Sequence, residues 1–111
     1  MVLQTRIAPF TLRRNDEPVR SETAELIMQQ DGNLVVYDEF HNPRWGSDTV
    51  GRGWEARFQT DGNLAIYNIH GVAVWGSGTE GHPGSLLMVQ DDGNVVIYDG
   101  NAAIWATNTW H

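Results

Sequence analysis

The sequence contains no cysteine, few basic residues and no long apolar run, and each absence excludes a class of protein. Without cysteine, a disulfide framework, a thiolate metal site and a cysteine nucleophile are all excluded. A formal net charge of −7 disfavours nucleic acid as a partner, because affinity for phosphate backbones depends on basic side chains. No segment is long enough to span a bilayer, and the first residues lack the apolar run of a signal peptide. We therefore expect a soluble protein without membrane insertion, and the sequence leaves open whether it is secreted or cytoplasmic.

The residues that are present favour one small β domain. A chain of 111 residues with 41% hydrophobic content suits a single core, so residues 1–111 are predicted to form one domain. Five tryptophans, three tyrosines and three phenylalanines can fill that core, and twelve glycines indicate tight turns between strands. The predicted fold class is all-β.

Three segments of the chain repeat one another and are each followed by a tryptophan. The segments are MQQDGNLVVYD at 28–38, FQTDGNLAIYN at 58–68 and VQDDGNVVIYD at 89–99. The tryptophan elements are WGSDT from Trp45, WGSGT from Trp75 and WATNT from Trp105. Such a period is typical of a repeated structural unit, and the units are placed at about 21–50, 51–80 and 81–111.

The Asp-Gly pair in each segment predicts a β-hairpin, because glycine tolerates the positive φ that such turns need. A second reversal is expected after each tyrosine, at 39–43, 68–71 and 99–101. For the first hairpin we predict a three-residue loop, Asp31–Asn33, with strand alternation on either side. The pairs that this loop predicts are Gln30–Leu34, Gln29–Val35 and Met28–Val36.

One face of each hairpin is then apolar in every copy and is predicted to be the core. Its residues are Met28, Leu34 and Val36, then Phe58, Leu64 and Ile66, then Val89, Val95 and Ile97. Because each apolar face needs a partner, three antiparallel sheets are expected around a pseudo-threefold axis, with Trp45, Trp75 and Trp105 meeting near it. Trp54 and Trp110 lie outside the repeated positions and are candidates for a dimer contact.

The opposite face carries the same polar set in each copy, within reach of one small ligand once the turn has folded. The candidate binding residues are Gln29, Asp31, Asn33, Val35 and Tyr37, then Gln59, Asp61, Asn63, Ala65 and Tyr67, then Gln90, Asp92, Asn94, Val96 and Tyr98. The set offers amide and phenol donors, a carboxylate acceptor and one apolar side chain. This combination suits a sugar, which presents hydroxyl groups beside a patch of C–H groups.

Two other interpretations of this face explain the sequence less well. Asp-Gly-Asn alone is ordinary turn chemistry, but a turn does not require the glutamine and the tyrosine in every copy. A glycosidase would need two carboxylates flanking one bond, whereas each copy has one well-placed aspartate. The histidines are scattered without metal-ligand spacing. No catalytic residue, metal or cofactor is therefore expected.

The threefold pattern Q-x-D-x-N-x-V-x-Y resembles the signature of the monocot mannose-binding, or bulb-type, lectins, which have a β-prism II fold. The resemblance extends from about Ser21 to the C-terminus. It implies binding of α-D-mannose and mannose-rich glycans at up to three sites. In the first copy it implies that Asp31 and Asn33 bind the axial 2-hydroxyl, Gln29 the 3-hydroxyl and Tyr37 the 4-hydroxyl, while Val35 packs on ring carbons.

The chain departs from the family pattern in three places. Ala65 stands where the other copies have valine, no cysteine is present for the disulfide of the plant members, and residues 11–20 lack the glycine-spaced leucine pattern. The alternative function is an interaction protein or a bacteriocin-like or toxin-like defence protein on the same fold. Family resemblance also implies a homodimer, formed by exchange of C-terminal strands.

Overall fold

The computed structural model describes residues 5–7 and 9–111, and the regular elements of this part of the chain are all β-strands. The strands are β1 (Thr5–Ile7), β2 (Phe10–Arg13), β3 (Val19–Arg20), β4 (Ala24–Met28), β5 (Leu34–Asp38), β6 (Pro43–Gly46), β7 (Glu55–Phe58), β8 (Leu64–Tyr67), β9 (Ala73–Gly76), β10 (Leu86–Val89), β11 (Val95–Asp99) and β12 (Ala102–Ala106). Within the described residues, no helix has the length and apolarity needed to cross a bilayer.

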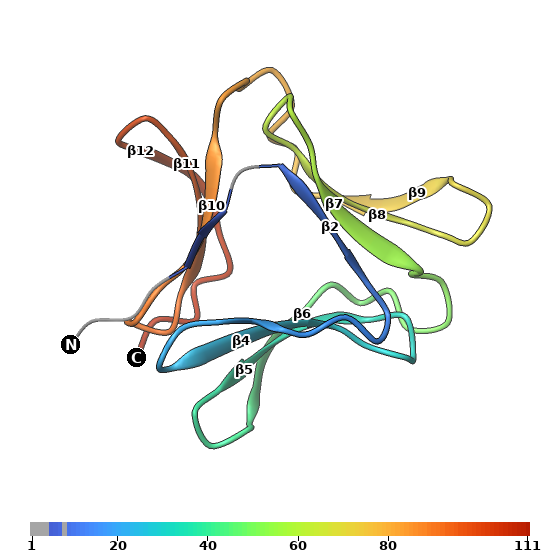
Figure 1. Cartoon of the computed structure of the whole chain (residues 1–111), viewed down its shortest axis with the longest axis horizontal. Helices are drawn as coiled ribbons and strands as arrows, with labels where there is room; N and C mark the ends of the chain where they lie inside the picture. Colours follow the sequence, from blue (N-terminus) through green and yellow to red (C-terminus); the bar gives the residue numbers. More distant parts are fainter. Residues whose placement is uncertain (1–4, 8) are drawn as a thin grey trace.

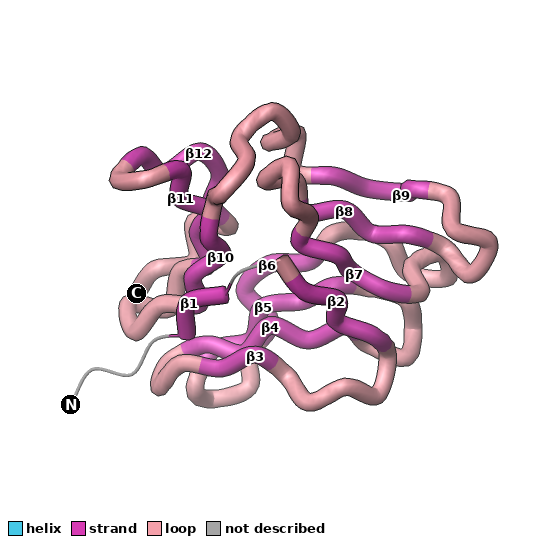
Figure 2. The backbone as a smooth tube through the Cα atoms, turned by 45° about the horizontal axis from the view of Figure 1, so that its top comes forward, coloured by secondary structure: helices cyan, strands magenta, loops and turns pink. Residues whose placement is uncertain are grey.

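The strands form three four-stranded antiparallel sheets that face one another as the sides of a prism (Figure 1). The strand orders are β3-β4-β5-β6, β2-β7-β8-β9 and β1-β10-β11-β12. Each sheet contains the three consecutive strands of one repeat, and Figure 2 shows how its hairpins project from the body of the molecule. The predicted all-β class, with three antiparallel sheets in a β-prism II arrangement, is confirmed.

The fourth strand of every sheet comes from the N-terminal segment that the repeats do not include. Strand β1 pairs with β10, β2 with β7 and β3 with β4. Leu12 of β2 is buried among the core side chains, so this segment adds to the core as well as to the sheets. Strands β1, β2 and β3 therefore connect the three repeats, although this part of the sequence contains no copy of the repeated motif.

The prediction of a three-residue loop in the first hairpin is wrong, because the loop has five residues. Met28 pairs with Leu34 and Ile27 with Val35, so the loop comprises residues 29–33 and the register is shifted by two residues. The cause is a β-turn that begins earlier than predicted, in which the Gly32 N–H donates to the Gln29 carbonyl at 3.1 Å. Because side chains alternate with a period of two, this shift leaves every residue on its predicted face.

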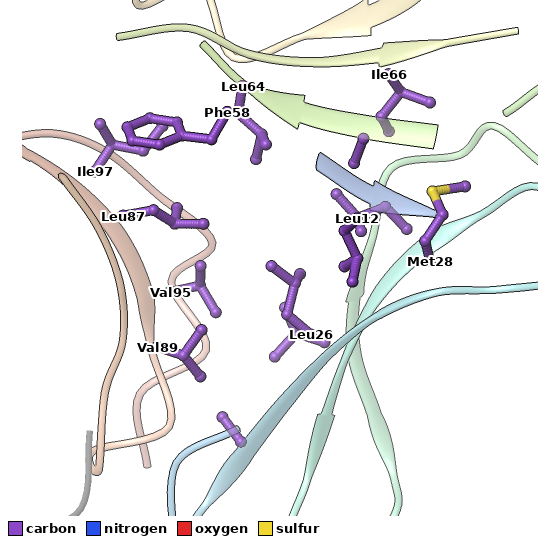
Figure 3. Close-up of a cluster of buried hydrophobic side chains, with 14 residues drawn as sticks. Leu12, Leu26, Met28, Phe58, Leu64, Ile66, Leu87, Val89, Val95 and Ile97 are labelled. Carbon is purple, nitrogen blue, oxygen red and sulfur yellow. The ribbon is translucent and has the colours of Figure 1, made fainter. Parts of the chain in front are cut away.

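The apolar faces of the three hairpins meet in one core, as predicted. All nine side chains predicted for it have exposed fractions of 2% or less, and Figure 3 shows those of the three sheets pointing toward one another. Leu12, Leu26 and Leu87 join this cluster from the neighbouring strands. The sheets therefore share a single core, and none of them has one of its own.

The three repeated tryptophans also meet, as predicted. The ring centroids of Trp45, Trp75 and Trp105 are 5.5, 5.6 and 5.7 Å apart, and the rings are edge-to-face with interplanar angles of 69°, 83° and 72°. Such geometry is favourable for aromatic pairs. The rings are partly buried against the aliphatic core. The nearly equal distances reflect the pseudo-threefold symmetry of the chain.

A buried carboxylate stabilises the outer hairpin of the first repeat. The Asp38 side chain accepts hydrogen bonds from the Asn42 and Phe40 N–H groups at 2.9 Å and pairs with Arg44 Nε at 2.8 Å. These bonds, that of Asn42 above all, lower the pKa of Asp38 to about 2. Since the folded-state pKa lies below the unfolded value, the resulting stabilisation is present above about pH 4 and is lost as the pH falls toward 2.

Candidate functional site

Each candidate site is built on the turn that joins the first two strands of its repeat. In the first copy the Gln29 N–H donates to the Asn33 carbonyl at 2.9 Å, and Gly32 has a φ of 93°. Gly62 and Gly93 have a φ of 90° in the equivalent turns. A left-handed conformation favours glycine at this position, which explains why the Asp-Gly pair occurs in all three copies.

The aspartate and the asparagine of each turn are held together by a hydrogen bond to the main chain. The Asn33 N–H donates to Asp31 Oδ1 at 2.9 Å, and the equivalent bonds measure 3.0 Å at Asp61 and 2.9 Å at Asp92. All three aspartates are exposed. The bond to Oδ1 therefore holds the orientation of each carboxylate. The exposed carboxylate can still accept hydrogen bonds from a ligand.

The glutamine and the tyrosine of each copy are joined by a side-chain hydrogen bond. Gln90 bonds the Tyr98 hydroxyl at 2.9 Å, and the same bond joins Gln29 to Tyr37 and Gln59 to Tyr67. When the Gln29 amide accepts from Tyr37 through its oxygen, its nitrogen lies 3.2 and 3.3 Å from the two Asp31 carboxylate oxygens. In the first copy Gln29 therefore links the turn carboxylate to the tyrosine hydroxyl.

The asparagine is oriented by residues that sequence analysis did not assign to the site. Asn33 Oδ1 accepts from Ser47 Oγ and from the Thr49 N–H, both at 3.1 Å. Thr49 Oγ1 in turn donates to the Gly32 carbonyl at 2.7 Å. The same network recurs at Ser77 and Thr79, and at Thr107 and Thr109.

Because the Ser and Thr residues donate hydrogen bonds to the asparagine Oδ1, the asparagine Nδ2 group remains available as a donor to a ligand. Gly46 lies so close to Asn33 that a Cβ there would be 2.9 Å from Nδ2. The signal for the network was present in the sequence, because each of Trp45, Trp75 and Trp105 is followed by a Ser or Thr two residues on and a Thr four residues on. It was interpreted only as part of the strand that carries the tryptophan.

A shallow hollow lies over the first copy. Its volume is about 410 Å³, and it is lined by Gln29, Asn33, Val35 and Tyr37 together with residues 43–46 of β6. Asp31 is not among the lining residues, but its carboxylate contacts the Gln29 amide. Four of the five predicted residues of this copy therefore line one hollow, and the hydrogen bonds of its turn recur in the other two copies.

The apolar member of each site is more buried than the sequence suggested. Val35, Ala65 and Val96 have exposed fractions of 4%, 3% and 3%. Each therefore offers a ligand little apolar surface. The replacement of valine by Ala65 removes correspondingly little exposed contact from the second site.

The neighbours of the tyrosine distinguish the first two sites. His41 stacks on Tyr37 with the ring centroids 4.4 Å apart. In the second copy the Arg57 guanidinium lies 4.3 Å from the Tyr67 ring centroid, in a cation–π arrangement. A hydrogen bond to Glu55 is the main cause that raises the pKa of Arg57, so this group is charged throughout the physiological range.

The third site is bounded by the C-terminal residue. A Cβ on Gly93 would lie 2.2 Å from the His111 ring, and the His111 N–H donates to the Asp92 carbonyl at 2.6 Å. A hydrogen bond with the Thr109 carbonyl is the main cause that raises the pKa of His111, and the bond to Glu39 adds to it. The third turn is therefore packed against the end of the chain.

Two further aspartates, Asp91 and Asp99, bond to groups outside the three turns. Asp91 Oδ1 accepts from the Glu22 N–H at 3.0 Å, as expected from its position next to Asp92. Asp99 pairs with His82 Nδ1 at 2.9 Å. Among residues 5–7 and 9–111, no group of three or more histidine or acidic side chains is arranged to hold a metal ion.

Comparison with known proteins found similarity in solved structures. A monomeric monocot mannose-binding lectin from Gastrodia elata shares 36% sequence identity and a TM-score of 0.83, over 98% of this chain and 99% of that chain. The mannose-specific agglutinin of snowdrop, Galanthus nivalis, solved with methyl-α-D-mannoside, shares 36% identity and a TM-score of 0.73, over 98% of both chains. A Marasmius oreades lectin shares 30% identity and a TM-score of 0.82, over 96% of this chain and 91% of that chain. No protein-family model and no curated protein sequence matches the chain.

Proposed function

The chain belongs to the monocot mannose-binding lectin family, and from this premise we propose that it is a lectin for α-D-mannose and mannose-rich glycans. The observation that carries the proposal is the set of residues repeated in three copies with the same hydrogen bonds. In each copy an exposed carboxylate, an oriented asparagine and a glutamine–tyrosine pair surround a shallow hollow or its equivalent surface. We propose that residues 1–111 form one lectin domain made of three repeats.

The proposed contacts follow from the donors and acceptors that the fold leaves free. Asp31 offers acceptor capacity and Asn33 offers Nδ2, which together suit a hydroxyl that both donates and accepts. Gln29 and Tyr37 lie across the hollow, where they can bind the two adjacent hydroxyl groups. The same roles are proposed for Asp61, Asn63, Gln59 and Tyr67, and for Asp92, Asn94, Gln90 and Tyr98.

The geometry supports binding without catalysis. Lectins are carbohydrate-binding proteins that are not enzymes, and the compared structures are lectins. Each proposed site has a single aspartate, whereas hydrolysis of a glycosidic bond uses a carboxylate pair. The compared structures give no support to the alternative of a toxin-like interaction protein.

Calorimetric titration with methyl α-mannoside and methyl α-glucoside tests this function. The two sugars differ only in the 2-hydroxyl, which is axial in mannose and lies between the carboxylate and the asparagine in the proposed pose. We expect measurable heat with the mannoside and none with the glucoside at the same concentrations. A folded protein that gives no heat with the mannoside or with a mannose-rich glycan would contradict the proposal.

The shallowness of the sites makes avidity the proposed route to useful affinity. One site should bind a monosaccharide weakly, and a branched glycan that engages several sites gains effective concentration without new contacts. The three sheets that carry the sites face in different directions around the molecule (Figure 1). A cell surface or a glycoprotein with many mannose termini is therefore the proposed partner.

We further propose a homodimer formed by exchange of C-terminal strands, which would double the number of sites. Within the single chain β12 pairs with β11, and a partner could supply the same pairing in its place. Trp110, whose exposed fraction is 66%, and Trp54 are available for the contact. We expect sedimentation velocity to show a dimer at micromolar concentration, and a monomer at every concentration would contradict this.

A further inference from the structure

A second hollow lies directly beside the second candidate site. It has a volume of about 560 Å³, and its lining includes Pro9, Thr11, Arg57, Gln59 and Asp61. Gln59 and Asp61 belong to the proposed mannose site, so the two binding surfaces share a wall. A ligand that fills the mannose site can therefore extend into this hollow without leaving the protein surface.

Strand β2 and Arg57 form part of the hollow, and Arg57 differs from the residues at the equivalent positions of the other two repeats. Thr11 of β2 pairs with Arg57 of β7, and Arg57 pairs with Ala65 of β8. The equivalent pairs in the other repeats are Ile27 with Val35 and Met88 with Val96. Only the second repeat thus combines a small residue in the mannose site with a long cationic residue opposite it.

Arg57 is held in position and retains hydrogen-bond donors. Its Nε donates to Glu55 at 3.0 Å, and its guanidinium lies over the Tyr67 ring. Its two terminal nitrogens form no hydrogen bond with the described residues, and 42% of the side chain is exposed. A planar, oriented guanidinium loses less conformational entropy on binding than a free arginine would.

The chemistry of the hollow favours a neutral, hydroxyl-rich ligand over an anion. Arg57 is already paired with Glu55, and Asp61 contributes a second carboxylate to the same surface. The formal net charge of −7 adds to the repulsion of an anion. Sugar hydroxyls can accept from the guanidinium and donate to the carboxylate at the same time.

We propose that Arg57 and the hollow beside it form a subsite for the second sugar residue of an α-linked mannose oligosaccharide, which makes Arg57 the specificity-determining residue of the second site. This inference rests on the proposed function, because the first sugar must occupy the site around Gln59 and Asp61. The second site then prefers oligosaccharides, while Ile27 occupies the equivalent position beside the first site.

Chains with a single intact site test this inference by calorimetry. The double variant Asp31→Asn, Asp92→Asn keeps only the second site, and Asp61→Asn, Asp92→Asn keeps only the first. The first site has its own adjacent hollow of about 460 Å³, lined by Ile27, Gln29 and Asp31 among others. Each chain is titrated with methyl α-mannoside, the isomeric α-linked dimannosides and a mannose phosphate.

In the chain that keeps the second site, we expect the best dimannoside to bind about tenfold more tightly than methyl mannoside. Adding Arg57→Met should lower that affinity ratio to about one. Methionine is the residue at this position in the third repeat, Met88, so it suits the strand. Arg52→Met, which removes the same charge from an exposed arginine bonded to the Asp48 carbonyl, should leave the ratio at about tenfold.

Several results would overturn the subsite. A ratio near one in the chain that keeps the second site, or a ratio that survives Arg57→Met, would do so. If Arg57→Met lowers the affinity for methyl mannoside and for the dimannoside equally, Arg57 belongs to the site of the first sugar. If the chain prefers the mannose phosphate and loses this preference in Arg57→Met, the hollow is an anion site. If Arg57→Met does not fold, Arg57→Lys serves instead, since it keeps the charge and loses the planar fork.

The failure of this inference can be distinguished from failure of the proposed function. Binding of methyl mannoside by the unmodified chain, without any dimannoside preference at the second site, overturns the subsite alone. Absence of heat with every ligand in the unmodified, folded chain overturns the proposed function, and the subsite with it.

Discussion

Replacement of Asp31, Asp61 and Asp92 together by asparagine is expected to abolish detectable mannose binding while the protein stays folded. Each aspartate uses Oδ1 to accept a main-chain N–H within its own turn, and an asparagine oxygen can accept the same bond. The turn therefore survives, but the exposed carboxylate that would bind the sugar hydroxyl is lost. A hydrogen bond to a charged group contributes about 1.5–3 kcal/mol, which is a large share of the affinity of a weak, shallow site.

Calorimetry with methyl α-mannoside, together with thermal unfolding, measures this effect. Asp16→Asn is the matched control, because the Asp16 carboxylate also accepts a main-chain N–H, that of Arg13 at 2.7 Å, in a turn outside the three repeats. Single replacements should each reduce the number of sites per chain and leave the affinity of the others unchanged. Normal mannoside binding by the folded triple variant would contradict the assignment of these aspartates.

Gly62→Ala is expected to lower the free energy of unfolding by about 2–5 kcal/mol and to remove binding at the second site. Gly62 has a φ of 90°, and a Cβ there would lie 2.4 Å from the His82 carbonyl oxygen. The left-handed conformation costs an alanine about 1–2 kcal/mol, and overpacking against rigid main chain adds about 1–3 kcal/mol. The displaced turn would also misplace Asp61 and Asn63.

The variant Gly71→Ala separates the cost of the left-handed conformation from the cost of the steric contact. Gly71 has a φ of 77° in the β8–β9 hairpin, but a Cβ there would meet nothing within 4 Å. It should therefore cost only the conformational part, about 1–2 kcal/mol. Urea unfolding followed by tryptophan fluorescence compares the two variants, and an equal loss of stability in both would show that the contact with His82 has no effect.

The C-terminal packing gives the third site a different boundary from the other two. Gly32 and Gly62 lie against the main chain at Gly53 and His82, whereas Gly93 lies against the His111 ring. The main-chain N–H of residues 51, 82 and 111 bonds the carbonyl of the turn aspartate in each copy. Three turns of one sequence motif are thus supported by three different segments.

The sequence by itself determined the repeat and the alternation of side chains along the strands, and it predicted the residues of the candidate sites. Alternation has a period of two, so the core residues Met28, Leu34 and Val36 could be assigned even though the predicted loop was two residues too short. The convergence of Trp45, Trp75 and Trp105 also followed, because three equivalent apolar faces can be buried only against one another.

Only the tertiary structure decided which strands complete the sheets and which groups orient the site. The N-terminal segment has no copy of the motif, and its pairing with β10, β7 and β4 depends on edges that exist only after the repeats have assembled. The bonds from Ser47 and Thr49 to Asn33 span 14 and 16 residues. Arg57 reaches its position over Tyr67 across a strand pair. The spacing of Ser and Thr after the repeated tryptophans shows that these residues recur, but it does not show which groups they contact, because the packing of the strands creates those contacts.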